Sequence, residues 1–127
     1  MMIYVSGKTL EDMMIQLRRA TYPKLGLTFE EVEHKVIDWG ECRSLYLKSN
    51  IHAQMRKLSE EMRELLIAVD DCDRDRTIDA IGDMIVVLTH IAKFTRLPLT
   101  NCYIHAYNEI KDRRGTMING LFVKEEE

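Results

Sequence analysis

Helix-breaking residues are scarce in this chain, which has two prolines and six glycines among its 127 residues. A turn-rich all-β fold draws heavily on both residue types. Their scarcity therefore favours a helical fold. The length predicts a single domain, large enough for a hydrophobic core but small enough to gain from oligomerisation.

Cysteine is infrequent as well. Cys42, Cys72 and Cys102 are widely spaced and form no CxxC pair. An odd number of cysteines without a signal peptide predicts reduced thiols in a cytosol, not a disulfide framework. The first residues, MMIYVSGKTLEDMM, lack the cationic start and apolar core of a secretion signal, so we expect a cytoplasmic protein.

The chain also lacks excess positive charge and long hydrophobic runs. Its formal net charge is −3, which gives no electrostatic basis for non-specific nucleic-acid binding. No apolar run approaches the roughly 20 residues that span a bilayer. We therefore expect neither nucleic acid nor membrane as a partner.

Apolar residues recur at helical spacing in five stretches, and this pattern predicts an all-α fold. The stretches are 9–22, 28–47, 50–71, 76–96 and 100–114. Residues 28–114 form the predicted four-helix core of a single domain, 1–127, with an additional N-terminal helix within 1–27 and an extended tail at 115–127. Gly40 is a predicted bend, and the almost wholly apolar stretch 76–96 is predicted to be buried on several sides.

Acidic residues border the apolar faces of two of these stretches. Glu61 and Glu64 share one helical face, with Glu60 at its edge, and Asp79 and Asp83 share a face of the next helix. The polar connection at 70–75 is short, so the two helices are antiparallel neighbours and the acidic pairs can meet.

Two interpretations of these carboxylates remain open from spacing alone. Packed together, they repel one another unless some are protonated or a divalent cation is bound, and oxygen-only ligands suit Mg²⁺ or Mn²⁺. Alternatively, they line a solvated face and pair with nearby cations. The candidates for that pairing are Arg56, Lys57, Arg63, Arg74 and Arg76.

The sequence EEMRE at 60–64, followed by DAIGD at 79–83, resembles the EExxE…ExxD signature of the MazG-like all-α nucleoside triphosphate pyrophosphohydrolases. The resemblance covers roughly residues 36–126 and is strongest to the small phage-type members. It departs at Ala80, where the family has a glutamate. Asp79 lies one residue earlier, so we expect Glu61, Glu64 and Asp83 to be the main metal ligands and Asp79 an additional one.

The resemblance implies Mg²⁺-dependent hydrolysis of a nucleoside or deoxynucleoside triphosphate to monophosphate and pyrophosphate. A carboxylate, with Glu60 and Glu61 as the candidates, would orient or deprotonate the attacking water. In the family, the lysine and arginine equivalent to Lys111 and Arg114 contact phosphates. Asn108 continues their helical face, and Lys57 is a further phosphate-binding candidate. A cation near a helix C-terminus also has a purely structural explanation.

Three residues are candidates for holding the base or sugar. Trp39, the only tryptophan, can stack on a base, although a lone tryptophan in a helical domain is more often part of the core. Asn50 and Gln54 can contact base or sugar edges, and Asn50 is equally explained as a helix cap.

We expect a homodimer or homotetramer, since the apolar stretch 76–96 in so short a chain suggests subunits that bury helices against each other. Family members are typically dimers or tetramers as well. Two alternatives stay open. The first is a related enzyme that acts on phosphoribosyl-ATP or another nucleotide, and the second is a helical interaction module without activity, which the departure at Ala80 keeps possible.

Overall fold

The computed structural model describes residues 26–126, and their fold is mostly helical, as predicted. The helix expected at 9–22 lies outside the described residues. Among the described residues the elements are α2 (Phe29–Cys42), α3 (Leu45–Lys48), α4 (Ile51–Asp70), α5 (Arg74–Phe94), α6 (Leu99–Ile110), β1 (Gly115–Ile118) and β2 (Leu121–Lys124).

Side-chain caps fix where three of the helices begin. The Thr28 hydroxyl accepts a hydrogen bond from the Glu31 amide at 3.1 Å, and the Asn50 side chain accepts from the Ala53 amide at 2.9 Å. The Asn50 cap was predicted, and Thr28 with Glu31 three residues later is the sequence pattern of a capping box. Asp73 does the same for α5 by accepting from the Arg76 amide at 3.1 Å. Each cap satisfies an amide that has no partner within its helix.

The predicted helix at 28–47 is interrupted, but not at Gly40. The chain leaves α2 after Cys42, turns at Ser44 with a φ of 58°, and re-enters a helix as α3. Gly40 is buried inside α2, where a Cβ would lie 3.0 Å from the Tyr46 hydroxyl oxygen. Its lack of a side chain lets the Tyr46 ring fold back over the helix.

The tail forms a β-hairpin, a regular element that the predicted extended tail did not include. β1 pairs antiparallel with β2, with Thr116 opposite Val123. The turn consists of Asn119 and Gly120, which both have positive φ angles, of 51° and 82°. An Asn-Gly pair between two short apolar runs is the strongest local hairpin signal, and it was present in the sequence.

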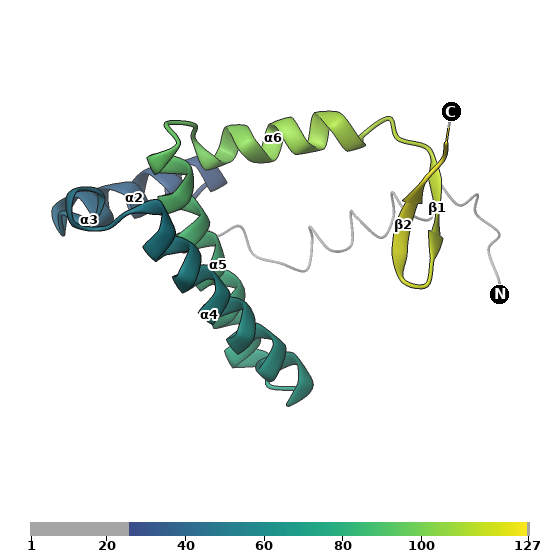
Figure 1. Ribbon diagram of the computed structural model, residues 1–127, viewed down its shortest axis with the longest axis horizontal. Coiled ribbons are helices and arrows are strands. Elements are labelled where there is room, and N and C mark those ends of the chain that lie inside the picture. The colour runs from purple at the N-terminus through teal and green to yellow at the C-terminus, as the bar shows by residue number, and fades with distance from the viewer. Residues whose placement is uncertain (1–25, 127) are drawn as a thin grey trace.

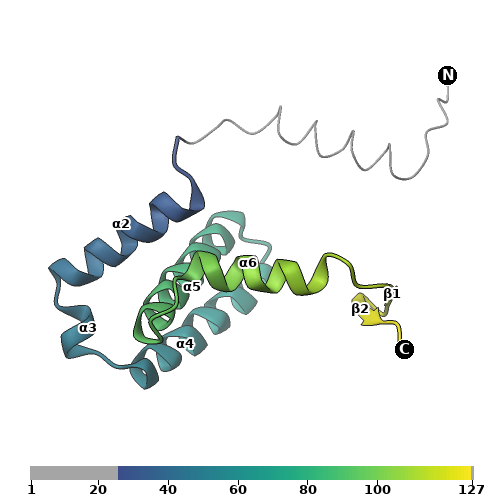
Figure 2. The same cartoon turned by 90° about the horizontal axis from the view of Figure 1, so that it is seen from above.

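Helices α4 and α5 lie side by side as an antiparallel pair, as the short connection predicted (Figure 1). Helix α2 contacts α5 toward the end that leads into α6, away from the connection between α4 and α5 (Figure 1). Helix α6 begins beside both α2 and α5. From there α6 projects away from α4 and α5 and carries the β-hairpin at its far end (Figures 1 and 2).

A buried carboxylate joins α6 to α2. Glu33 is only 4% exposed, and its oxygens accept hydrogen bonds from the amides of Leu99 and Thr100 and from the Thr100 hydroxyl. Residue Pro98 at the start of α6 supplies no side-chain cap. Glu33 therefore replaces the missing cap from a distant helix and places a negative charge at the positive end of α6.

At the C-terminal end of α2, a small aromatic cluster packs against α5. The Tyr46 hydroxyl oxygen lies 2.8 Å from Nδ1 of the buried His90, whose ring is stacked 6.1 Å from that of Trp39. Burial, and secondarily the charge of Glu41, raises the pKa of Tyr46 to about 12, and burial lowers the pKa of His90. His90 is thus a satisfied core residue in its neutral form.

We expect the stability of the fold to fall below about pH 6.5 because of His90. Its folded-state pKa lies below the unfolded value, so protonation favours the unfolded chain and the contribution is lost as the pH falls. Urea unfolding at pH 7.5 and 5.5 measures the loss for wild type and for His90→Gln. The loss should be smaller for His90→Gln and unchanged for a variant of the exposed His105; equal losses for wild type and His90→Gln would contradict this assignment.

Helix α5 is less buried within the chain than its sequence predicted. Ala80, Val87 and Ala92 are buried, whereas Ile78 is 51% exposed and Ile81 is 47% exposed. The described helices cover only part of its circumference, so an apolar face remains open to solvent. Within residues 26–126, no helix combines the length and apolar character needed to cross a membrane.

Candidate metal centre

Three carboxylates from α4 and α5 converge in the structure. Glu61, Glu64 and Asp83 each offer an oxygen atom, and these three atoms lie within 4.8 Å of one another. Glu61 and Glu64 are three residues apart on α4, and the antiparallel packing brings Asp83 of α5 against them. We call these three residues the acidic cluster.

Glu61 distinguishes the acidic cluster from an ordinary solvated acidic face. Its side chain is buried, whereas those of Glu64 and Asp83 are exposed. Among residues 26–126, Glu61 Oε2 finds no hydrogen-bond partner. A buried carboxylate oxygen without a partner is costly, because it has lost its water without any compensating donor. A cation bound among the three carboxylates would remove that cost, so the residues fit a divalent metal ion.

Lys57 partly neutralises the acidic cluster in this structure. Its ammonium nitrogen lies 3.2 Å from Glu61 Oε1 and 3.5 Å from Glu60 Oε2. The hydrogen bond to Glu61, together with the charge of Glu61, raises the pKa of Lys57. Lys57 is therefore a cation at the edge of the cluster, one helical turn before Glu61, and it leaves Glu61 Oε2 unpaired.

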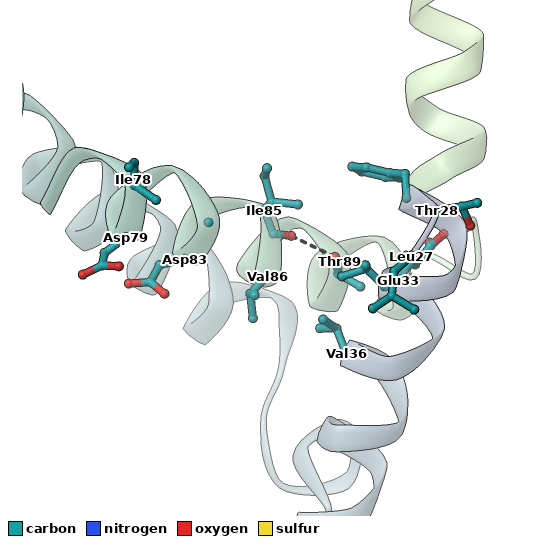
Figure 3. A pocket seen from close by; sticks show the side chains of 13 residues that line it. Leu27, Thr28, Glu33, Val36, Ile78, Asp79, Asp83, Ile85, Val86 and Thr89 are labelled. Carbon is teal, nitrogen blue, oxygen red and sulfur yellow. Dashed lines mark hydrogen bonds between the residues drawn. The ribbon is translucent and has the colours of Figure 1, made fainter. Parts of the chain in front are cut away.

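Two other positions of DAIGD, Asp79 and Ala80, differ from Asp83 in their surroundings. Asp79 is exposed and is not part of the acidic cluster. Its carboxylate points to the same side of α5 as that of Asp83, one turn away (Figure 3). Ala80, which occupies the place of the family glutamate, is 3% exposed. The structure thus brings together three of the four predicted metal ligands.

The predicted phosphate-binding residues of α6 lie apart from the acidic cluster within one chain. Asn108 is near the end of α6, Lys111 follows it, and Arg114 precedes β1, at the end of α6 that projects away from α4 and α5 (Figure 2). Arg114 also shares a surface hollow with acidic residues. The acids of that hollow are Glu109, Asp112, Glu125 and Glu126.

The predicted base- and sugar-binding residues already have structural contacts. Trp39 is 48% exposed, and the Arg43 guanidinium carbon lies 4.3 Å from its ring centroid. Asn50 caps α4, and the Gln54 side chain donates a hydrogen bond to the Ser49 hydroxyl at 3.1 Å. None of the three is among the residues that line the pocket beside the acidic cluster.

That pocket was not predicted from the sequence. It lies between α2 and α5, has a volume of about 690 Å³, and includes Asp83 of the acidic cluster in its lining (Figure 3). Its walls are mostly apolar residues that periodicity assigned to the core. The one local signal was Gly82, a glycine in the interior of an otherwise apolar helix.

Compared with models of protein families, with curated proteins and with solved structures, the chain matches none.

Proposed function

We propose that this protein is a metal-dependent nucleotide pyrophosphohydrolase, which cleaves a nucleoside or deoxynucleoside triphosphate to the monophosphate and pyrophosphate. The proposal includes a MazG-like arrangement of the helices and a cytoplasmic location. It rests on the resemblance of EEMRE and DAIGD to the family signature, together with the geometry of the acidic cluster.

One observation carries the proposal. Glu61 is 4% exposed and converges with Glu64 and Asp83 to within 4.8 Å. Its Oε1 pairs with Lys57 at 3.2 Å, but its buried Oε2 has no hydrogen-bond partner among the described residues. This oxygen lies beside two exposed carboxylates that a substrate can reach. Oxygen donors of this kind suit Mg²⁺, with Mn²⁺ as a substitute.

The residues of the acidic cluster and its edge have different roles in the proposed hydrolysis. A bound divalent cation would neutralise phosphate oxygens and make a water molecule more nucleophilic. Glu61, Glu64 and Asp83 would hold it, while Glu60, exposed beside them, would orient the attacking water and accept its proton. Water oxygen bonds to phosphorus, the bridging P–O bond breaks, and the leaving group is pyrophosphate. Lys57 would then bind a phosphate oxygen from the edge of the cluster.

The proposed enzyme is a homodimer or homotetramer. Apolar side chains of α5 such as Ile78 and Ile81 are exposed in the single chain, as are all eight strand residues of the hairpin. A two-stranded hairpin without cover is only marginally stable. Packing of a second copy would bury these surfaces and could bring Lys111 and Arg114, the cations that follow α6, to a nucleotide on another chain.

The exposed apolar faces also favour a second candidate function, that of a helical interaction module without activity. The two candidates differ in what the acidic cluster does. In an interaction module it is part of a surface and needs no metal, whereas in the enzyme its metal is required for turnover.

Pyrophosphate release from a panel of ribo- and deoxynucleoside triphosphates tests the proposal. We expect pyrophosphate and monophosphate in equal amounts with Mg²⁺ or Mn²⁺, and none with EDTA. Phosphoribosyl-ATP is included in the panel to test the alternative that the enzyme hydrolyses this nucleotide. Release of single phosphates would mean that a different bond is cleaved, and folded protein that releases nothing from any substrate would favour the interaction module.

A further inference from the structure

The pocket between α2 and α5 continues directly from the acidic cluster. Asp83 belongs to both, since it lines the pocket and contributes an oxygen to the cluster. From Asp83 the pocket extends along α5 to the start of α2, where Leu27 and Thr28 precede the helix (Figure 3). A molecule with a phosphate group at the cluster would therefore have its remaining part over this pocket.

The size and lining of the pocket suit an uncharged ring system. Its volume is about 690 Å³, within the range of roughly 300–1,000 Å³ that is usual for small-molecule sites. Val32 and Val36 of α2 and Ile85 and Val86 of α5 are among its lining residues. Apolar walls with a few polar groups at one end are typical of sites that hold a flat, partly apolar ligand.

The three carboxylates in the pocket lining differ in the contacts that they make. Glu33 is occupied as the cap of α6, and Asp83 belongs to the acidic cluster. Asp79 has neither role, and its carboxylate lies beside that of Asp83 at the mouth of the pocket (Figure 3). A carboxylate can only accept hydrogen bonds, so its complement is a donor such as a sugar hydroxyl.

Gly82, next to Asp83 in the sequence, forms part of the pocket wall. Among the described residues, a Cβ built at Gly82 would meet no heavy atom within 4 Å, so close packing against them does not require a glycine there. In a helix interior, glycine costs about 1 kcal/mol relative to alanine. The missing side chain instead leaves space in the pocket next to Asp83.

We propose that the α2–α5 pocket binds the nucleoside part of the substrate, with Gly82 leaving room for it and Asp79 accepting a hydrogen bond from a sugar hydroxyl. This inference rests on the proposed function for the position of the phosphates. It assigns recognition of the nucleoside to a surface that contains none of Trp39, Asn50 and Gln54.

The test compares Gly82→Phe, which fills the pocket, with Leu88→Phe, which adds the same ring at an exposed position of α5 outside the pocket lining and the acidic cluster. Binding is measured by calorimetry with Mg²⁺ for two ligands, a nucleoside triphosphate that the wild type binds and inorganic tripolyphosphate, which lacks the nucleoside. Gly82→Phe should weaken nucleotide binding by at least about tenfold, while its affinity for tripolyphosphate stays within about twofold of the wild-type value. Leu88→Phe should resemble the wild type for both ligands.

Circular dichroism and sedimentation velocity accompany each variant, and Gly82→Leu replaces Gly82→Phe if the larger side chain prevents folding. Unchanged nucleotide binding by a folded variant would overturn the inference. So would equal loss of both ligands together with a changed sedimentation coefficient, which would make the pocket an interface between copies of the chain.

The same measurements separate this inference from the proposed function. If the wild type binds nucleotides without hydrolysing them, and Gly82→Phe abolishes that binding, the pocket assignment stands and the enzymatic activity fails. If the wild type hydrolyses nucleotides and Gly82→Phe keeps the same KM, the activity stands and the pocket assignment fails.

Discussion

Glu64→Gln should lower metal-dependent pyrophosphate release by about 100-fold or more while the fold stays intact. Changes to the outer partners of metal ligands already cost about 10- to 100-fold, and this substitution removes a ligand oxygen's charge directly. Glu64 is exposed and makes no hydrogen bond or ion pair with other described residues, so its replacement does not leave a buried group unpaired. Steady-state kinetics with saturating Mg²⁺, alongside thermal unfolding, measure both effects.

The matched control is Asp70→Asn, which removes a carboxylate from the exposed last residue of the same helix, outside the acidic cluster. It should keep wild-type turnover. Asp83→Asn should repeat the loss seen for Glu64→Gln, because its oxygen belongs to the same cluster. Wild-type rates in Glu64→Gln would show that the cluster is not the catalytic site.

Glu33→Ala should lower the free energy of unfolding by about 2–3 kcal/mol. The substitution removes the charged acceptor for two amides and a hydroxyl at the start of α6. Hydrogen bonds to charged groups contribute about 1.5–3 kcal/mol, and a buried donor left without a partner adds its own cost. For a domain of this size the loss corresponds to a fall in Tm of roughly 10 °C.

Glu30→Ala is the control on the same helix. Glu30 is exposed and its contact with His34, at 3.8 Å, lies on the surface, so we expect a change of no more than about 1 kcal/mol. Hydrogen exchange gives a local reading, because loss of the Glu33 cap should reduce protection of the first amides of α6 before those of α4. If the two variants unfold at the same urea concentration, Glu33 does not anchor α6.

Local signals in the sequence were enough to locate most helices. Asn50 caps α4 where it was predicted to do so, because capping depends on residues within one turn. The spacing of Glu61 and Glu64, with the short connection at 70–75, likewise predicted that Asp83 would lie beside them. These features depend on helix geometry and on the packing of immediate neighbours in the chain.

Features that depend on distant contacts were not predictable in the same way. Glu33 lies among other glutamates of α2, and only the approach of Leu99 and Thr100, 66 residues away or more, gives it a role. The pocket beside Gly82 depends on the separation of α2 from α5, which no local pattern encodes. Asp79 was expected in the cluster with Asp83, but it lies one turn earlier on the same side of α5, where it lines the pocket (Figure 3).

The most direct test of the central claim is a Mn²⁺ titration of the wild-type chain and of Glu64→Gln, followed by electron paramagnetic resonance. If Glu61, Glu64 and Asp83 form a metal centre, the wild type should bind Mn²⁺ stoichiometrically, Mg²⁺ should displace it, and Glu64→Gln should bind at least about tenfold more weakly. Equal binding by the two proteins, or no binding by the folded wild type, would contradict the account.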